Sequence, residues 1–511
     1  MILGVIFDSP KLTFKKHLNY IIQETKKRLN TLRALSSIRW GANRNLLRRV
    51  YLSFIRSRIE YGIAIYGNLC QSDLRKLEVL QNQALRCILG ARKTSPITSM
   101  EAEAYVLPIH IRIEYLQLKW YIKLMHRDEN DNTLEQLKLH SHKENSPFKE
   151  ETKALIGVMQ VPSIQRVTTP VISPIPPWCD PKEHIYLDLP GRTGTMTATM
   201  QDLTEAVLEE RFLGYTQIYT DGSKLESGSV SAAFYVPCLN KSVGWLMSPN
   251  HTILGAELFA MYKALEFSLS TNEIRKTNLV ILSDSMSGLH LIRDGRCPSY
   301  KQMVYKIQIL IEQKKRLSKV SFQWVKSHSN IRGNEIADKV AGMSHKNDKS
   351  VLTKLNYEEA LKMLNSKLCD YWKRLWKFKV IYSGVGSFYS DMVEMPKLCL
   401  WKAHKSRSLE CATTRLRLGH VGVGKHMHRF NMNDTAMCQF CNTEDDIRHF
   451  LLFCRRFNMS RTSLKTKLSN IQVEFNLKNI IGCGNFNAKK QRQIQKYLTE
   501  YLLGTDRVEK L

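Results

Sequence analysis

Apolar residues recur along residues 11–125 with the three- and four-residue spacing of amphipathic helices. Within 15–35 and again within 74–90, apolar side chains share one helical face, and Lys and Arg are common on the others. These faces are formed by Leu18, Ile21, Ile22, Leu29 and Leu32, and by Leu74, Leu77, Leu80, Ala84 and Ile88. The pattern predicts an all-α region. The simplest interpretation of this pattern by itself is a helical bundle with a basic, solvated exterior.

From about residue 214 the pattern becomes that of an α/β unit. Five short β-rich runs, of which the first three follow one another directly, are combined with helical segments: YTQIYT, VSAAFYV, SVGWLM, LVILSDS and VSFQWVKSH. The order β-β-β-α-β-α-α-β-α predicts a mixed five-stranded sheet with helices packed on its faces. Beyond residue 350 the spacing is helical again.

Seven prolines between residues 161 and 191 mark a boundary. Proline at this density disfavours both helix and central strand, because it fixes φ and lacks an N–H group. We therefore expect four segments: a helical region over 1–125, a linker over 126–211, an α/β domain over 212–347, and a helical region over 350–511.

Charge and length narrow the class of protein. The chain has 511 residues, too many for a single core, and its apolar fraction of 43% excludes wholesale disorder. The formal net charge of +29 is concentrated at the ends, with +12 over 1–120, +3 over 121–350 and +14 over 351–511. Two basic flanks around a near-neutral middle favour nucleic acid as a partner; a solvated Lys/Arg surface is the simpler alternative.

Membrane insertion and secretion are not expected. No uncharged apolar run approaches the roughly 18–20 residues that span a bilayer, and the start of the chain lacks the basic region of a signal peptide. The 12 cysteines are mostly scattered, which is typical of reduced thiols. We expect an intracellular protein of the nucleus or cytoplasm.

Four acidic residues stand at or near the ends of regular elements in the α/β unit. They are Asp221 and Asp284 at strand ends, and Glu257 and Asp338 early in helices. Any one alone is best interpreted as a turn residue or helix cap. Brought together, the four would repel one another unless divalent cations neutralised them. Mg²⁺ prefers oxygen ligands, and two such ions about 4 Å apart can hold the attacking and departing oxygens of a phosphodiester in line.

The strings around these acids resemble type 1 ribonuclease H. They are TDGS at 220–223, GAEL at 255–258, SDS at 283–285 and VKSHSNIRGNEIAD at 325–338, the last in the form carried by non-LTR retrotransposons. The resemblance implies endonucleolytic hydrolysis of the RNA strand of an RNA/DNA hybrid. It also implies that the four acids bind two Mg²⁺ ions, which Mn²⁺ can replace, and that His328 assists product departure or proton movement.

Three polar residues near these motifs form a second candidate set. Ser223, Ser285 and Asn334 are suited to hydrogen-bond sugar 2′-hydroxyls or phosphates, which is how a protein distinguishes RNA from DNA. The alternative is that they serve only as turn and cap residues.

Close spacing of cysteine and histidine marks a candidate metal site at 438–454. Cys438, Cys441, His449 and Cys454 have the ligand types of a tetrahedral zinc site. Because the protein fills all four positions, the expected Zn²⁺ is structural. The stretch resembles the zinc-binding region that follows the nuclease in some non-LTR retrotransposon proteins, and both a nucleic-acid-binding role and a purely stabilising role fit it. The alternative is three unlinked thiols and a surface imidazole.

The N-terminal strings LGVIFDSPKLTFKKHLNYI, SRIEYGIAIYGNLC and LEVLQNQALRCILGA resemble the end of the palm and the thumb of a non-LTR reverse transcriptase. The one Asp-Asp pair of the chain is Asp445-Asp446, inside the expected zinc loop, so the catalytic aspartates of a polymerase are not found. We therefore expect a retrotransposon polyprotein fragment that acts as a ribonuclease H. Two alternatives stay open: a non-catalytic nucleic-acid-binding protein with an inactive nuclease fold, and a partial reverse transcriptase lacking its polymerase site.

Overall fold

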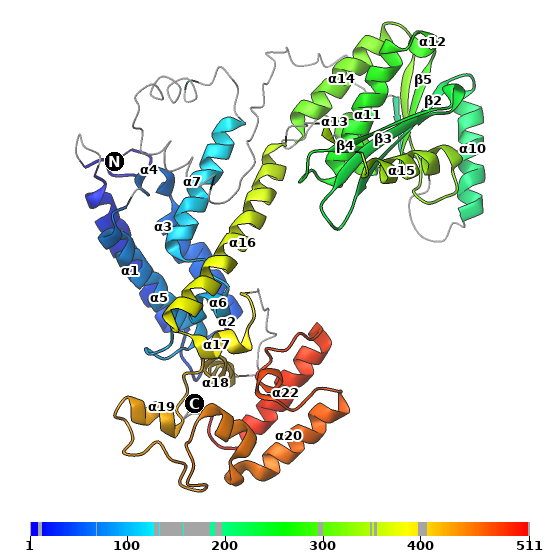
Figure 1. Ribbon diagram of the computed structural model, residues 1–511. Coiled ribbons are helices and arrows are strands. Elements are labelled where there is room, and N and C mark those ends of the chain that lie inside the picture. Colours follow the sequence, from blue (N-terminus) through cyan, green and yellow to red (C-terminus); the bar gives the residue numbers. More distant parts are fainter. Residues whose placement is uncertain are drawn as a thin grey trace. The chain divides into compact units, whose positions relative to one another are not determined.

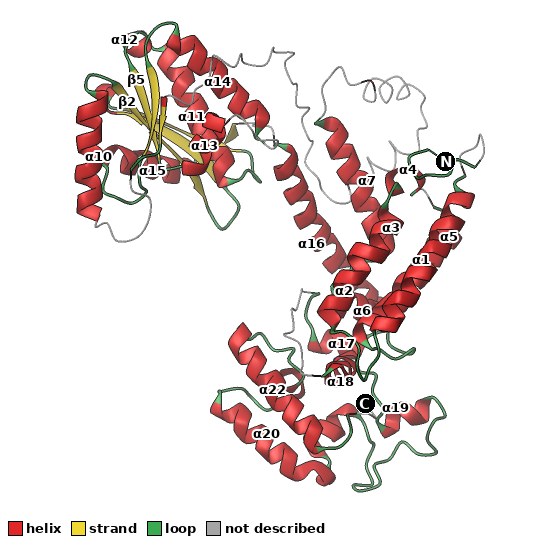
Figure 2. Cartoon of the chain, turned by 180° about the vertical axis from the view of Figure 1, so that it is seen from behind, coloured by secondary structure: helices red, strands yellow, loops and turns green. Residues whose placement is uncertain are grey.

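The computed structural model describes residues 2–8, 13–67, 69–126, 132, 157, 184–189, 197–294, 300–347, 350–351, 355–396, 406–508 and 511. These residues form two compact units, which are described separately (Figures 1 and 2). Unit 1 combines Met1–Leu118 with Leu368–Leu511, and unit 2 is Lys119–Lys367. The expected Pro-rich segment lies outside the described residues, apart from 184–189. No helix among the described residues is both long and apolar enough to cross a bilayer.

Unit 2 is built on a seven-stranded sheet with the order β1-β6-β5-β2-β3-β4-β7. The strands are β1 (Ile185–Tyr186), β2 (Thr216–Lys224), β3 (Val230–Val236), β4 (Lys241–Met247), β5 (Leu279–Ser283), β6 (Val320–Trp324) and β7 (Ser350–Val351). Strands β2, β3 and β4 form an antiparallel meander, whereas β5 pairs in parallel with both β2 and β6. The five central strands are the five expected ones, so the predicted mixed sheet is confirmed. Two-residue strands β1 and β7 extend its edges.

Helices cover both faces of this sheet. They are α10 (Thr197–Phe212), α11 (Ile253–Ser270), α12 (Asn272–Arg275), α13 (Met286–Asp294), α14 (Lys301–Lys315) and α15 (Arg332–Ser344), with a 3₁₀ turn at Pro237–Leu239. One core joins the sheet to α11, α13 and α14, and a second core joins its other face to α10 and α15 (Figure 1). Strands β5 and β6 are therefore buried at every residue, as their continuous apolar runs require.

The α/β unit begins earlier than the expected boundary at residue 212. Strand β1 pairs in parallel with β6, with Ile185 opposite Phe322. Helix α10 packs Leu208 and Phe212 against the strand residues that include Leu282. Both elements fall within the range expected to be a linker, and the structure places them on the sheet because they supply apolar side chains to its edge and face.

Unit 1 is all-α in its described residues. Its N-terminal helices are α1 (Lys15–Leu35), α2 (Arg44–Val50), the π-helical turn η1 (Tyr51–Arg56), α3 (Ser57–Glu60), α4 (Ile63–Tyr66), α5 (Gln71–Leu89), α6 (Ile97–Ala104) and α7 (Ile109–Met125). Its later elements are α16 (Tyr357–Ser383), α17 (Ser387–Met392), α18 (Arg407–Leu418), α19 (Gly424–Arg429), η6 (His449–Phe453), η7 (Arg455–Phe457), α20 (Asn458–Asn470), α21 (Leu477–Ile480) and α22 (Ala488–Gly504). Helices α7 and α16 cross the boundary between the two units.

The two ends of the chain share one hydrophobic core. Leu47 and Leu85 from the N-terminal helices belong to the same buried cluster as Leu416, Phe450 and Leu498 from the C-terminal region. The expected division into a thumb-like region over 1–125 and a separate helical region over 350–511 therefore differs from the observed units. Sequence periodicity reveals which helical face is apolar, but not which distant helix covers it.

A buried network of charges joins the same two regions. Glu103 on α6 contacts Arg44 on α2 at 2.8 Å and Arg417 on α18 at 2.9 Å, and Tyr389 donates a hydrogen bond to it at 3.0 Å. Burial opposes ionisation of Glu103, but the two guanidinium groups outweigh it and hold the pKa of this carboxyl at about 2. Arg417 also donates to the carbonyl of Ile481 at 3.0 Å.

Glu103→Gln tests this network. The substitution keeps the shape of the side chain but leaves two buried guanidinium groups without their carboxylate, so we expect the free energy of unfolding of unit 1 to fall by about 3–5 kcal/mol. Hydrogen exchange of α5 and α18 in a denaturant series measures this. Glu444→Gln is the control, because Glu444 pairs with Lys425 on the surface and its loss should cost under about 1 kcal/mol. Equal effects would contradict the central role of Glu103.

Candidate active site and zinc cluster

Strand register brings two of the predicted acids to one edge of the sheet. Thr220 of β2 lies opposite Ser283 of β5 in the parallel pair, so Asp221 and Asp284 follow at neighbouring positions. Asp221 lies two residues after Tyr219 in the strand, so both side chains are on the same face of the sheet. The Tyr219 side chain packs in the core beneath α15. Its carboxyl group therefore points toward the helix that carries the fourth predicted acid.

A glycine allows α11 to bring Glu257 to the same place. A Cβ atom added at Gly222 would lie 2.8 Å from the backbone nitrogen of Glu257 and 3.0 Å from its Cγ. The start of α11 is fixed by Thr252, whose hydroxyl accepts a hydrogen bond from the Gly255 N–H at 3.0 Å. The Thr252 N–H in turn donates to the buried Glu359 at 2.8 Å. The position of Glu257 beside β2 therefore depends on two features: residue 222 has no side chain, and two hydrogen bonds of Thr252 fix the start of α11.

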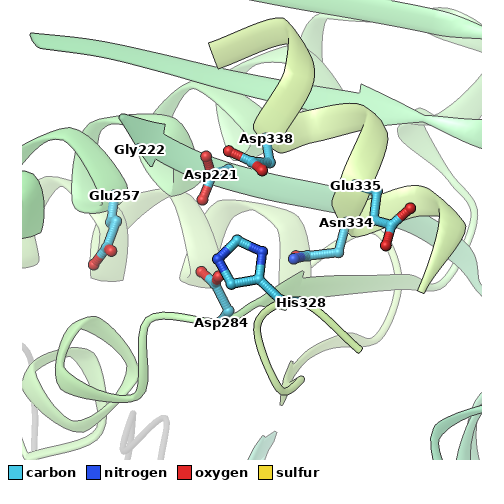
Figure 3. A pocket seen from close by; sticks show the side chains of 8 residues that line it. All are labelled: Asp221, Gly222, Glu257, Asp284, His328, Asn334, Glu335 and Asp338. Carbon is cyan, nitrogen blue, oxygen red and sulfur yellow. The ribbon is translucent and has the colours of Figure 1, made fainter. Parts of the chain in front are cut away.

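All four acids line one cavity of about 200 Å³ (Figure 3). Its described lining residues are Asp221, Gly222, Glu257, Asp284, His328, Asn334, Glu335 and Asp338. The structure thus brings together the four predicted acids, the predicted histidine and one of the three polar candidates. Gly222 and Glu335 were not predicted as site residues, although they lie inside the TDGS and GNEIAD strings that contain the predicted acids Asp221 and Asp338.

Burial and mutual repulsion raise the pKa of the carboxyl groups in this cavity. The pKa of Asp221 rises to about 8, first because the side chain is withdrawn from water and then because the three other carboxylates repel its charge. Burial also raises the pKa of Glu257 to about 7, although a hydrogen bond from Ser285 opposes the rise. The pKa of Asp284 is raised chiefly by burial. Assembling these groups as anions therefore costs free energy when no cation is bound.

The donor set of the cavity fits divalent metal ions. Of the eight described residues that line it, none is Lys or Arg, so the protein supplies no permanent positive charge of its own there. Carboxylate oxygens are the ligands that Mg²⁺ prefers, and about 200 Å³ leaves room for ions with bound water. The residues able to bind such ions are Asp221, Glu257, Asp284 and Asp338.

His328 and Asn334 complete one side of the cavity. His328 is exposed on the loop after β6, where its φ of 52° and that of Asn330, 58°, form a tight left-handed turn. Asn334, near the start of α15, is 5% exposed, and its side chain hydrogen-bonds Asp284. The Asn334 Oδ1 atom is buried and has no hydrogen-bond partner among the described residues. This atom is therefore an acceptor available to a donor that enters the cavity.

Comparison with known proteins agrees with this geometry. Residues 214–345 match the family model described as RNase H. They form a ribonuclease H domain. The chain is also 27% identical over 132 residues to the RNA-directed DNA polymerase from mobile element jockey of Drosophila funebris, and 26% identical over 122 residues to the protein of that name from Drosophila melanogaster.

These matches cover small parts of the relatives. They span 26% and 24% of this chain, but 14% and 13% of the two mobile-element proteins. The predicted fold is confirmed, and so is the resemblance to a non-LTR retrotransposon protein. The domain assignment supports divalent-metal use and nucleic-acid binding at the level of the family.

The two predicted serines of the ribonuclease H domain lie beside the cavity and not among its lining residues. Ser285 is buried, donates a hydrogen bond to Glu257, and accepts one from the Gly288 N–H at 3.1 Å at the start of α13. The Ser223 hydroxyl is hydrogen-bonded to the His345 Nε2 atom at 3.1 Å. Ser285 thus positions a carboxylate and begins a helix, which is the cap role that the sequence left open.

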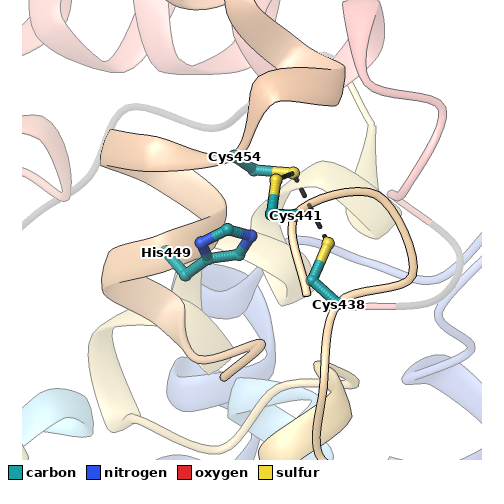
Figure 4. Close-up of side chains that lie close together, drawn as sticks. All are labelled: Cys438, Cys441, His449 and Cys454. Carbon is teal, nitrogen blue, oxygen red and sulfur yellow. Dashed lines mark hydrogen bonds between the residues drawn. The ribbon is translucent and has the colours of Figure 1, made fainter. Parts of the chain in front are cut away.

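The predicted zinc ligands converge in unit 1 (Figure 4). One ligand atom from each of Cys438, Cys441, His449 and Cys454 lies within 4.8 Å of all the others. The Cys454 sulfur is 3.8 Å from that of Cys438 and 3.9 Å from that of Cys441. A tetrahedral zinc ion with Zn–S bonds of about 2.3 Å separates its sulfur ligands by about 3.8 Å. The spacing of the sulfur atoms therefore fits zinc.

Contacts around this cluster orient its ligands. The His449 Nδ1 atom is hydrogen-bonded to the Thr443 hydroxyl at 3.2 Å, while its buried Nε2 has no hydrogen-bond partner in the described chain. The Arg455 N–H donates to the Cys441 sulfur at 3.2 Å and lowers the pKa of that thiol, which favours the thiolate form that binds metal.

Two further hydrogen bonds assign a structural role to Asp445 and Asp446. Asp445 accepts a hydrogen bond from the Gly424 N–H at 2.8 Å, and Asp446 accepts one from the His449 N–H at 2.7 Å. Both carboxylates support the loop that carries the four candidate metal ligands.

The raised carboxyl pKa values give the ribonuclease H domain a distinct pH dependence. Asp221 has an ordinary pKa of 3.8 and a folded-state value of about 8, so the folded domain binds more protons between these values. In the presence of chelator, the free energy of opening of β2 and β5 should therefore fall as pH rises through this window. Hydrogen exchange of their amides, corrected for intrinsic rates, measures it.

Asp221→Asn should flatten this pH dependence and stabilise the metal-free domain at pH 8 by about 1–3 kcal/mol, because it removes the repelled charge. Asp202→Asn is the matched control, since Asp202 is exposed on α10 and does not line the cavity. An unchanged slope in Asp221→Asn would show that repulsion at this residue is not the cause.

Proposed function

We propose that this protein is an endonuclease that hydrolyses the RNA strand of RNA/DNA hybrids with two divalent metal ions. The observation that carries the proposal is the cavity of the ribonuclease H domain, where four carboxylates from four separate elements meet without a Lys or Arg among its described lining residues. A site built in this way is unfavourable by itself and favourable with cations. Two cations suit a phosphodiester substrate, because its attacking and departing oxygens both carry negative charge during the reaction.

Each residue of the cavity has a specific task in this proposal. Asp221, Glu257, Asp284 and Asp338 would bind Mg²⁺ or Mn²⁺, which activates a water molecule and neutralises charge on the scissile phosphate when bound. Ser285 and Asn334 fix the carboxylates of Glu257 and Asp284 by hydrogen bonds. Cleavage leaves 3′-hydroxyl and 5′-phosphate ends.

Asn334 and His328 act on the substrate itself. The unpaired Asn334 Oδ1 accepts a hydrogen bond from a sugar 2′-hydroxyl, which DNA lacks. His328 is exposed at the mouth of the cavity on a loop, so its imidazole is suited to move a proton or to help the product leave. Ser223, held by His345, would contact the backbone of the nucleic acid next to Asp221.

Two other functions receive less support. A non-catalytic binding protein has no use for a cavity in which burial and repulsion by three other carboxylates raise the pKa of Asp221. A polymerase activity, suggested by the names of the jockey proteins, would require paired catalytic aspartates; Asp445-Asp446 supports the zinc loop instead. The net charge of +29 lies mostly in the two ends of the chain, which form unit 1, and favours a nucleic acid as a partner of that unit.

We also propose that Cys438, Cys441, His449 and Cys454 bind a structural zinc ion. All four positions of a tetrahedral ion are filled by protein, which leaves no position for a substrate. Phe450 and Leu451, next to His449, are fully buried in the core of unit 1, so the ion would fix the segment that delivers them.

The nuclease proposal is tested with the full chain on labelled RNA/DNA hybrid, duplex DNA and duplex RNA, with Mg²⁺ or with chelator. We expect cutting of the hybrid alone, and a loss of at least about 100-fold in Asp221→Asn and Asp284→Asn, because each removes a charge that binds metal. Asp202→Asn should cut as the unmodified protein does. Hybrid cutting that survives chelator and both active-site substitutions would overturn the metal assignment. Binding to all three duplexes without cutting would favour the non-catalytic alternative.

The zinc proposal predicts one tightly held zinc ion per chain, measured by native mass spectrometry. Cys441→Ser should lose the ion and increase hydrogen exchange over residues 438–457, because the loop is then held by hydrogen bonds alone. Cys238→Ser, at an exposed thiol of unit 2, should change neither. Full zinc occupancy in Cys441→Ser would refute the assigned ligand set.

A further inference from the structure

A second cavity, of about 310 Å³, lies within unit 1. Its walls come from α2, η1, the end of α3, the segment 105–107 after α6, the start of α7, and the part of α16 that belongs to unit 1. None of its lining residues belongs to the ribonuclease H domain, and the proposed nuclease mechanism does not use it. The cavity combines a cationic wall with an aromatic and aliphatic one.

Three arginines form the cationic wall, and two of them share one carboxylate. Arg112 donates to both oxygens of Glu60, at 2.6 and 2.8 Å, and Arg56 donates to the same group at 2.9 Å. Arg48 instead donates to two neutral acceptors, the backbone carbonyls of Ala104 at 2.8 Å and of Tyr105 at 2.9 Å. The lining residues therefore carry three positive charges and one negative charge.

The carboxyl group of Glu101 lies nearby, but it does not neutralise the excess positive charge of the lining residues. Glu101 is close enough to interact with Arg56, but burial raises its pKa to about 8, which disfavours its charged form. The Arg56 Nη2 atom is buried, on a residue only 3% exposed, and has no hydrogen-bond acceptor among the described residues. A guanidinium N–H group withdrawn from water without an acceptor is costly, and an anion held by the partly exposed Arg48 and Arg112 would offset the excess positive charge of this wall.

Aromatic rings also line the cavity and form its second wall. The rings of Tyr105 and Trp372 lie 5.3 Å apart at 60°, and Leu52, Val106 and Leu107 also line the cavity. Tyr105 has a φ of 49°, an unfavourable conformation for a bulky residue. The hydrogen bond from Arg48 to its carbonyl helps to hold that conformation, so the cationic and aromatic walls are fixed relative to each other.

We propose that this cavity binds a nucleotide through a terminal phosphate. A phosphate monoester carries nearly two negative charges at neutral pH, which matches the excess charge of the lining arginines. Its planar base suits the aromatic wall, and a volume of about 310 Å³ lies in the range of small-ligand pockets. The ligand is either a free mononucleotide or the 5′-phosphorylated end of a strand, since both present the same group.

Calorimetric titration of the full chain tests the ligand class. The probes are adenosine 5′-monophosphate, adenosine, inorganic phosphate, and one short single-stranded DNA with or without a 5′-phosphate. We expect the mononucleotide to bind at least about tenfold more tightly than adenosine or inorganic phosphate, because only it contacts both walls. A strand that binds only with its 5′-phosphate identifies strand ends as the source; binding of the mononucleotide alone identifies the free nucleotide.

Arg48→Gln should weaken mononucleotide binding at least about tenfold, because it removes a charge-assisted contact. Arg49→Gln is the matched control: it removes the same charge from the adjacent, exposed position of α2 and should change binding less than about twofold. If Arg48→Gln does not fold, Leu52→Glu places a carboxylate in the cavity, with Ser53→Glu at the exposed neighbouring position as its control.

Three results would overturn the proposal. The first is no binding of the mononucleotide at millimolar concentration. The second is equal affinity for inorganic phosphate, which would reduce the site to an anion contact. The third is equal weakening by Arg48→Gln and Arg49→Gln, which would mean that the general surface charge attracts the ligand.

Discussion

A charge that is taken out of water needs a partner of opposite sign, and this protein meets that requirement in two contrasting ways. In unit 1 the protein supplies both signs: Glu103 lies between Arg44 and Arg417, and its pKa is held at about 2. In the ribonuclease H domain it supplies only one sign, and the pKa of Asp221 rises to about 8. The first arrangement is complete and holds a core together. The second is neutralised only when cations bind, and this need for cations makes the cavity suited to bind metal ions.

Backbone geometry makes the second arrangement possible. Parallel pairing of β2 with β5 places Asp221 and Asp284 at adjacent strand ends, and the absence of a side chain at Gly222 lets the start of α11 approach. Hydrogen bonds from Ser285 and Asn334 then hold individual carboxylates in place. The repulsion among the acids is thus opposed by a rigid sheet and by short polar contacts, which keep the cavity open for ions.

Local sequence patterns were sufficient to predict what depends on local structure. Strand alternation, turn residues and the strings around Asp221 and Asp338 predicted the five central strands and the acids that meet beside them. The spacing of Cys438 and Cys441 likewise predicted a cluster that is closed by one short loop. In each case the relevant contacts follow from a strand end, a helix start or a tight turn.

Contacts between distant segments were not predictable in this way. Arg44 donates through its backbone N–H to Glu410, 366 residues further along the chain, and no periodicity encodes that pairing. Strand β1 and helix α10 joined the sheet although the prolines around β1 suggested a linker. The cavity beside Arg56 also escaped prediction, because its three arginines lie on helices whose basic residues were interpreted as a solvated surface. The role of Gly222 was also not predictable, because it depends on the close approach of α11 to a position without a side chain.

The shared core of unit 1 has a consequence for synthesis on the ribosome. The N-terminal helices emerge first, but the residues that cover them, such as Leu416 and Leu498, are translated several hundred residues later. The ribonuclease H domain, contiguous in sequence, is able to fold in the interval. Until the last helices are released, the nascent chain exposes an apolar surface that chaperones can bind.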